Sequence, residues 1–244
     1  MNTLNGLDQC FSFINAQLQP QGGLPLGPVP RRVVTLSRQT GSGACEVAKH
    51  LAEFLEARAP KPGCLWTVFD RNIVEKVIED HHLPKRIARF MPEDRISEVT
   101  DIMDELFGLH PSSWNLIHKT SETILHLAEM GNVILIGRGA PVITSKLDYA
   151  FHVRLVGSVE ERVRRLMHMT HVEAAEAREF IHREDKGRER YLRTYFNKDI
   201  NDPLLYHLII NTDLISPEEA GKLIGEALLA RPVKDTHPEP AVVL

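Results

Sequence analysis

The chain has 244 residues, of which 43% are hydrophobic and 25% are charged, so it can bury a sizeable core and wholesale disorder is disfavoured. The formal net charge of −4 argues against bulk electrostatic binding to nucleic acid, while leaving room for a local basic cleft. Three widely spaced cysteines, Cys10, Cys45 and Cys64, form no CxxC pair, which indicates neither a disulfide framework nor a zinc knuckle and is typical of a reducing compartment.

Nothing in the sequence predicts attachment to a membrane. No run of 18 apolar residues is present, and the first residues lack the basic segment and the apolar segment of a signal peptide. We therefore expect a cytoplasmic protein with no membrane partner and no nucleic-acid partner.

The first 30 residues are predicted to form a helix and a linker ahead of the main domain. Residues 7–18 place apolar side chains at helical spacing, at Leu7, Phe11, Ile14 and Leu18. The polar face of this helix has no Lys or Arg, so we expect it to pack on the domain or on a second subunit, as in a homodimer, rather than on a membrane surface. Residues 20–30 are rich in Pro and Gly. The main domain is therefore expected over 31–230, followed by a flexible, proline-containing tail over 231–244.

Five apolar runs follow the linker and predict five strands. They cover residues 33–36, 65–69, 132–136, 150–155 and 207–210. The third run is apolar almost throughout, as expected for a strand that is buried on both faces. Helical patterns separate the runs, at 46–57, at 72–80, over most of 84–130, after Ser158 and after Ser216. Strands joined through helices predict a parallel sheet with right-handed crossovers.

Two serines are predicted to start helices. Ser158 has Glu161 three positions further on, which is the pattern of a capping box. Ser216 is followed by Pro217 at the first helical position and by Glu219 at the third, which predicts a second capping box. The helix after Ser216 is expected to run to residue 229.

A turn with two glycines joins the first strand to the first helix of the main domain. Residues 37–46 read SRQTGSGACE, and a glycine turn before a helix can present backbone amides to an anion. The Walker A pattern would have Lys at Ala44, Ser or Thr at Cys45, and its first Gly at Arg38. The turn thus has glycines that admit a phosphate but neither the lysine nor the hydroxyl. A tight turn without a ligand is the alternative interpretation.

Five short motifs occur in order along the chain. They are Ser37-Arg38-Gln39-Thr40-Gly41-Ser42-Gly43, Phe69-Asp70-Arg71, Ile136-Gly137-Arg138-Gly139, Asp185-Lys186-Gly187-Arg188 and Ile210-Asn211-Thr212-Asp213. Their order and spacing resemble the cytidylate kinase-like family of P-loop proteins, from residue 32 to residue 229. The resemblance implies an α/β fold, namely a P-loop NTPase three-layer sandwich with a central five-stranded parallel sheet, a helical insertion and a lid over 178–200. It also implies an ATP-dependent kinase with nucleotide substrates that uses ATP and Mg²⁺.

The same resemblance implies roles for individual residues. The turn residues Thr40, Gly41, Ser42, Gly43, Ala44 and Cys45 would bind the donor nucleotide. Arg38, in place of the Walker lysine, would be catalytic, together with Arg183, Asp185 and Arg188 on a lid between two helices. Asp70, Arg71 and Arg138 follow strand ends, where open α/β sheets bind ligands, and would hold the acceptor monophosphate. Holding Mg²⁺ through water is the alternative role of Asp70.

The chain also departs from the family pattern. Cytidylate kinases have an Asp directly after the Arg of the third motif, where this chain has Gly139. This departure and the missing Walker lysine motivate a second hypothesis, a non-catalytic nucleotide-binding or regulatory module. A protein-interaction domain that uses the first helix and the helices of 84–130 is a third hypothesis.

Taken singly, each candidate residue has a structural interpretation. Arg38 is then a solvated turn residue, Arg138 a helix-packing residue and Asp70 an N-cap. We expect Cys45 to be an inert small side chain, with thiolate character at a helix N-terminus as the alternative. No Cys or carboxylate completes a metal site with the scattered histidines, so we expect no metal site formed by protein ligands.

Overall fold

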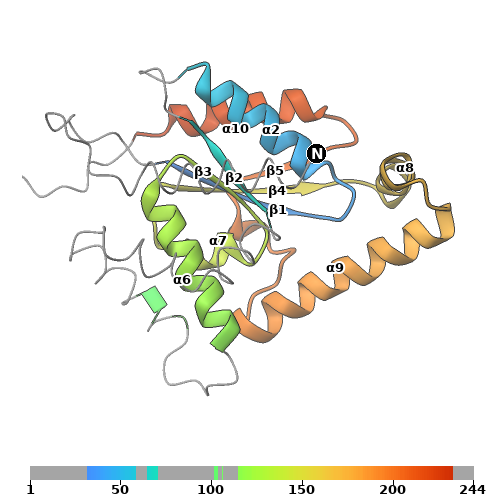
Figure 1. Ribbon diagram of the computed structural model, residues 1–244, viewed down its shortest axis with the longest axis horizontal. Coiled ribbons are helices and arrows are strands. Elements are labelled where there is room, and N and C mark those ends of the chain that lie inside the picture. The colour runs from blue at the N-terminus through green and yellow to red at the C-terminus, as the bar shows by residue number, and fades with distance from the viewer. Residues whose placement is uncertain (1–31, 59–64, 71–101, 104–105, 107–114, 233–244) are drawn as a thin grey trace, which may run out of the picture.

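The computed structural model describes residues 32–58, 65–70, 102–103, 106 and 115–232 (Figure 1). Several predictions from the sequence lie outside these residues. They concern the helix and linker of residues 1–30, the helix at 72–80, most of the helical stretch 84–130, Arg71, and the tail beyond residue 232. No helix among the described residues combines the length and the apolar character needed to cross a membrane.

A five-stranded parallel sheet forms the centre of the molecule. Its strands are β1 (Val33–Arg38), β2 (Thr67–Phe69), β3 (Val133–Ile136), β4 (Ala150–Val156) and β5 (Leu208–Asn211). They lie in the order β2-β3-β1-β4-β5, and each neighbouring pair runs parallel. The predicted parallel sheet is therefore confirmed. Because β1 lies in the middle, the turn that follows it stands between the carboxyl ends of β3 and β4.

Helices cover both faces of the sheet, which gives the predicted three layers (Figure 1). On one face, α2 (Ala44–Glu56) and α10 (Pro217–Ala230) lie side by side, and Leu51 and Ile224 are buried there against the sheet. On the other face, α6 (Asn115–Met130) and the short α7 (Ala140–Ile143) bury Leu125 and Ile143. Burial of two such apolar layers supplies the main driving force for this fold.

Two glycines allow α2 and α10 to pack closely. A Cβ atom at Gly221 would lie 2.8 Å from the backbone nitrogen of Leu51, and one at Gly225 would overlap the ring of Phe54. Only a residue without a side chain fits at such a distance. The close packing fixes α2 against its neighbour, and it thereby fixes the helix N-terminus that begins directly after the glycine turn.

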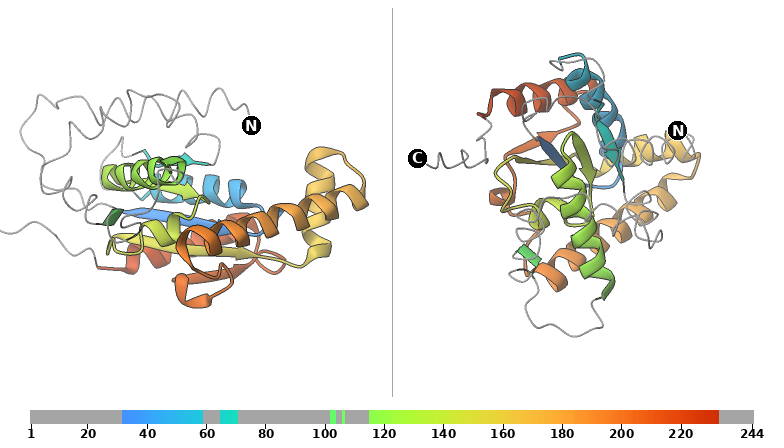
Figure 2. Two further views of the ribbon diagram at one scale, coloured as in Figure 1. Left: turned by 90° about the horizontal axis from the view of Figure 1, so that it is seen from below. Right: turned by 60° about the vertical axis from the view of Figure 1, so that its left-hand side comes forward.

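Two helices extend beyond the sheet. The first is α8 (Val159–Thr170) and the second is α9 (Ala174–Phe196), and Figures 1 and 2 both show them standing out past the strands. Val163 of α8 packs with Ala177 and Ile181 of α9. A short 3₁₀ helix, η2 (Pro203–Leu205), connects α9 to β5.

The placement of Arg183 and Arg188 between two helices is wrong, because residues 174–196 form one continuous helix. The segment contains Gly187, yet a single glycine costs a helix only about 1 kcal/mol. Most of its neighbours are Glu, Lys and Arg, which are good helix formers, so their propensities outweigh that cost. The helix ends at Asn197, which has a positive φ of 50°.

The structure confirms the second capping box in full and the first in part. Ser216 accepts a hydrogen bond from the amide of Glu219, whose carboxylate accepts one from the Ser216 amide in return. Ser158 accepts from the amide of Glu161, but its own amide donates to Asp213 at 2.6 Å instead. The reciprocal half of the first box is therefore replaced by a carboxylate from the segment after β5.

Candidate active site

The glycine turn forms a tight loop between β1 and α2. Gly41 has a φ of 79°, and a Cβ atom there would lie 2.7 Å from the carbonyl oxygen of Arg162. Ser42 closes the turn, because its amide and its hydroxyl both donate to the carbonyl of Gln39, at 3.3 and 2.8 Å. The hydroxyl of Ser42 is thus used inside the turn.

The turn leaves a row of backbone amides open. Within the described part of the chain, no acceptor pairs with the amides of Gly41, Gly43, Ala44, Cys45 or Glu46. The first bonded amide of α2 is that of Val47, which donates to the Gly43 carbonyl at 3.0 Å. Open amides at a helix N-terminus, together with the helix dipole, favour an anion at this position.

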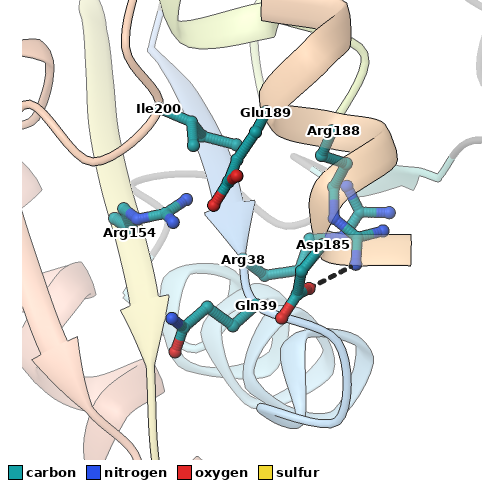
Figure 3. A pocket seen from close by; sticks show the side chains of 7 residues that line it. All are labelled: Arg38, Gln39, Arg154, Asp185, Arg188, Glu189 and Ile200. Atoms are coloured by element: carbon teal, nitrogen blue, oxygen red, sulfur yellow. Dashed lines mark hydrogen bonds and ion pairs between the residues drawn. The ribbon is translucent and has the colours of Figure 1, made fainter. Parts of the chain in front are cut away.

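One carboxylate joins the turn to α9. Asp185 accepts hydrogen bonds from the amide and from the hydroxyl of Thr40, both at 2.8 Å. Arg162 pairs with the same carboxylate at 2.7 Å. Arg188 pairs with it at 2.8 Å, as Figure 3 shows. Burial alone would raise the pKa of Asp185, but these hydrogen bonds outweigh burial and hold the pKa below its usual value. Asp185 is therefore an ionised clamp between two distant segments.

Arg162 completes this clamp and was not predicted from the sequence. Its side chain is buried, and besides pairing with Asp185 it donates to the carbonyls of Gly157 and Thr40, at 3.0 and 3.1 Å. It lies in the first turn of α8, just after β4 ends. The rule that singled out Arg138, a cation shortly after a strand, would have found it, but its neighbours Arg164 and Arg165 make the segment look like a solvated helix.

A pocket opens beside the turn, between the ends of β1 and β4 and the middle of α9 (Figure 3). It is open to solvent, and the empty space at its mouth and inside it together amounts to about 230 Å³. The residues that line it are Arg38, Gln39, Arg154, Asp185, Arg188, Glu189 and Ile200. Three of the predicted catalytic residues, Arg38, Asp185 and Arg188, thus meet at one pocket.

Arg38 lies in a strongly cationic environment. Burial lowers the pKa of Arg38 to about 10, and the neighbouring charges of Arg188 and Arg138 add to the effect, while Asp70 opposes it. A Cβ atom at Gly137 would overlap the Arg38 guanidinium, so this side chain lies against the segment after β3. The strand-end residues Asp70 and Arg138 therefore lie near Arg38, whereas Arg71 lies outside the described residues.

Arg183 is not brought to the turn. It is exposed on another face of α9, and its guanidinium lies 5.3 Å from the ring centroid of Phe180. Because 183 and 185 are two positions apart, they point to different sides of the helix. Its predicted catalytic role has no support from this arrangement.

The departure at Gly139 has a steric reason. A Cβ atom there would lie 3.0 Å from the ring of Phe196 and 3.4 Å from that of Tyr191, both from the end of α9. Burial raises the pKa of Tyr191 to about 12, and its hydroxyl has no hydrogen-bond partner among the described residues. Two aromatic rings thus occupy the space into which an acidic side chain at this position would extend.

Cys45 does not have the features of an activated thiol. The residue is exposed at the first turn of α2, but desolvation of its sulfur and the nearby Asp70 carboxylate raise the pKa of the thiol. These effects outweigh the attraction of Arg38. The thiolate interpretation is therefore disfavoured. Among the described residues, no group of three or more His, Cys, Asp or Glu side chains is arranged to hold a metal ion.

Comparisons with known proteins agree with this architecture. The cytidylate kinase of Pyrococcus horikoshii is 26% identical over 202 residues, which cover 82% of this chain and 90% of that protein. The cytidylate kinase of Pyrobaculum islandicum is 28% identical over 190 residues, which cover 77% and 88% of the two chains. An uncharacterized protein from Eubacterium ventriosum shares the fold, with a TM-score of 0.61 at 20% identity over 82% of this chain and 99% of that chain.

The match extends over most of the main domain. Residues 33–214 match the model of the cytidylate kinase-like family, from the first strand through the segment after the fifth. This span includes the glycine turn, the clamp at Asp185 and every residue that lines the pocket. The chain therefore belongs to the cytidylate kinase-like family.

Proposed function

We propose that the chain is an ATP-dependent nucleotide kinase that transfers a phosphoryl group to a nucleoside monophosphate, as cytidylate kinases do, or to a related small acceptor. The observation that carries the proposal is the row of open amides at the start of α2, next to a pocket lined by three arginines. Phosphoryl transfer needs positioned phosphates and cancellation of their charge, and this arrangement offers both.

The turn and the arginines have different roles in this proposal. The open amides from Gly41 to Glu46 hold the phosphates of the donor, as helix N-termini commonly do. Arg38 and Arg188 supply the positive charge that the Walker lysine supplies elsewhere. An oxygen of the acceptor phosphate then attacks the terminal phosphorus of ATP, and the bond to the ADP oxygen breaks.

The residues beside the turn also fit a magnesium ion. Mg²⁺ in such sites binds one or two carboxylates and completes its shell with phosphate oxygens and water. Asp70 is a carboxylate close enough to influence the pKa of both Arg38 and Cys45, so it stands at the turn. Asp70 would hold the ion, which would neutralise phosphate charge when bound.

The test is ADP release in the presence of Mg²⁺, with CMP, dCMP, UMP, AMP and GMP as acceptors. We expect turnover with at least one acceptor, and we expect Arg38→Met to lower kcat/KM about 100-fold or more, because a cation at the transferring phosphate is lost. Arg178→Met, which removes an exposed guanidinium elsewhere on α9, serves as the matched control.

A non-catalytic nucleotide-binding module is the second candidate. Ala44 and Cys45 in place of Lys and Ser or Thr, and the aromatic rings over Gly139, favour it. Calorimetry separates the two functions. ATP binding without turnover of any acceptor by the folded protein would refute the kinase and establish the module, and absence of nucleotide binding would refute both.

A further inference from the structure

A charged residue interrupts the most buried part of the sheet. Strand β4 reads Ala-Phe-His-Val-Arg-Leu-Val, and its Arg154 is only 4% exposed. Arginine is rarely buried to this extent unless its charge is compensated. The position was not among the site residues predicted from the sequence, although a lone charge in an apolar strand is a recognisable signal.

The protein partners of Arg154 are all neutral. Its two terminal nitrogens donate to the hydroxyl of Ser37 at 2.8 Å and to the side-chain carbonyl of Asn201 at 3.0 Å. The guanidinium also lies 5.7 Å from the ring centroid of Tyr206. No ion pair joins Arg154 to any Asp or Glu that the structure describes. The group is held in place, but its charge is not neutralised.

A second arginine at the same pocket, Arg38, also lacks an ion pair with the described residues, although the Asp70 carboxylate lies near enough to raise its pKa. No hydrogen bond or ion pair joins the guanidinium of Arg38 to the residues that the structure describes. Ser37 pairs with Arg154 in the register of β1 and β4, so Arg38 and Arg154 come from adjacent positions on neighbouring strands. Figure 3 shows both side chains at the pocket, Arg154 from β4 and Arg38 from the end of β1.

Of the two carboxylates that line the pocket, Asp185 is fully engaged and Glu189 forms no ion pair with a described residue. Asp185 is bonded to Thr40, Arg162 and Arg188. Glu189 accepts from the Asn201 amide at 3.5 Å, which leaves the carbonyl of Asn201 turned toward Arg154. Three arginines and two carboxylates line this open pocket, and two of the guanidiniums have no ion pair within the described part of the chain, so the pocket favours an external anion.

We infer that Arg38 and Arg154 together bind a phosphoryl group, and that Arg154 is a substrate-binding residue. A tetrahedral oxyanion can accept hydrogen bonds from both guanidiniums, and arginine binds phosphate oxygens in a forked geometry. That the phosphoryl group belongs to a nucleotide rests on the proposed function, whereas the anion site itself does not. The group belongs either to the donor triphosphate or to the acceptor monophosphate, since both carry the same chemistry.

Calorimetry on the full chain with pyrophosphate, a non-hydrolysable ATP analogue and CMP tests the inference. We expect Arg154→Met to weaken pyrophosphate binding about 10-fold or more, since one charge-assisted contact is lost. Arg154→Lys should restore part of the affinity, because it keeps the charge and loses the fork. A loss confined to the ATP analogue assigns the group to the donor, and a loss confined to CMP assigns it to the acceptor.

Asn201→Asp provides a second variant that leaves Arg154 in place. The new carboxylate is nearly the size of the amide and supplies the counter-charge that Arg154 lacks. The protein without ligand should therefore melt at a temperature no lower than that of wild type. Pyrophosphate should bind about 10-fold more weakly, because the carboxylate competes with it for Arg154. A purely structural Arg154 would leave pyrophosphate affinity unchanged in this variant.

The outcomes separate this inference from the proposed kinase. Wild-type affinity for all three probes in folded Arg154→Met or Asn201→Asp overturns the inference, even if the protein is a kinase. Arg154-dependent pyrophosphate binding in a protein that turns over no acceptor supports the anion site and refutes the kinase.

Discussion

Asp185 connects residues that lie 145 positions apart in the chain. At the scale of single residues, this carboxylate explains why α9 lies over the glycine turn at all, since it satisfies the amide and the hydroxyl of Thr40 and neutralises Arg162. Hydrogen bonds to a charged group contribute more than neutral ones, about 1.5–3 kcal/mol each in favourable cases. The contact of α9 with the glycine turn therefore depends on one ionised side chain, while apolar clusters hold the helix elsewhere.

Asp185→Asn should destabilise the protein by about 2 kcal/mol at pH 7, because the buried Arg162 loses its counter-charge. The folded-state pKa of Asp185 lies below its ordinary value of 3.8, so its contribution is fully present above that value and is lost as the pH falls through the folded-state pKa. Urea denaturation at pH 7 and at acidic pH should show the gap between wild type and variant closing on acidification.

Glu184→Gln is the matched control for that measurement. Glu184 pairs with Arg188 at 3.8 Å and takes no part in the contact with the turn, so its loss should change stability little. An equal effect of the two substitutions would contradict the role given to Asp185.

At the scale of elements, the strands and their direction were predictable and the contacts between distant elements were not. The five apolar runs and the capping serines are local sequence patterns, and the tertiary fold agrees with what they predict. The clamp between Thr40 and Asp185 depends on the angle at which α9 crosses the end of the sheet, and no local pattern encodes that angle. Arg154 was recognisable as a lone charge in an apolar strand, but a strand pattern does not reveal whether a buried charge has a partner.

Substitutions at two glycines test the packing of α10 against α2 and the helical conformation of α9. Gly221→Ala should destabilise the protein by about 2–3 kcal/mol, because the new methyl group would lie 2.8 Å from the Leu51 backbone and push α10 away from α2. Gly187→Ala should instead stabilise it by about 0.5–1 kcal/mol, since nothing lies within 4 Å of a Cβ atom there and alanine favours the helix.

Thermal or chemical denaturation of the two variants checks both signs against wild type. A destabilising Gly187→Ala would show that α9 is not helical at this position in solution. A neutral Gly221→Ala would show that α2 and α10 are further apart than described.

At the scale of the whole molecule, the buried His152 and its exposed neighbour His207 make stability depend on pH. His152 is 6% exposed and shares a hydrogen bond with Thr35 at 2.8 Å, while its amide donates to the ring of His207 at 2.9 Å. Burial lowers the pKa of His152 to about 3, and His207 and Arg231 add to the effect. Burial, followed by Arg231, also lowers the pKa of His207. The His152 ring is therefore neutral in the folded protein near pH 6.

Stability should consequently fall as the pH drops below the ordinary histidine value of 6.5, because the unfolded chain binds protons that the folded chain excludes. His152 contributes a slope of up to about 1.4 kcal/mol per pH unit between its ordinary and its folded-state pKa. Urea denaturation of wild type and His152→Gln between pH 7.5 and 5 measures this slope, which should be shallower in the variant. His182→Gln, at an exposed position on α9, should keep the wild-type slope.

The parallel direction of the strands has a consequence for engineering. All strands end on the same side, so the glycine turn, the clamp and the pocket share one rim, while Arg231 and His207 lie toward the side where β4 and β5 begin. Heat tolerance and acid tolerance can thus be adjusted at one rim without disturbing ligand binding at the other. Libraries that randomise the two rims separately should yield variants whose gains combine additively, because the altered positions share no partners.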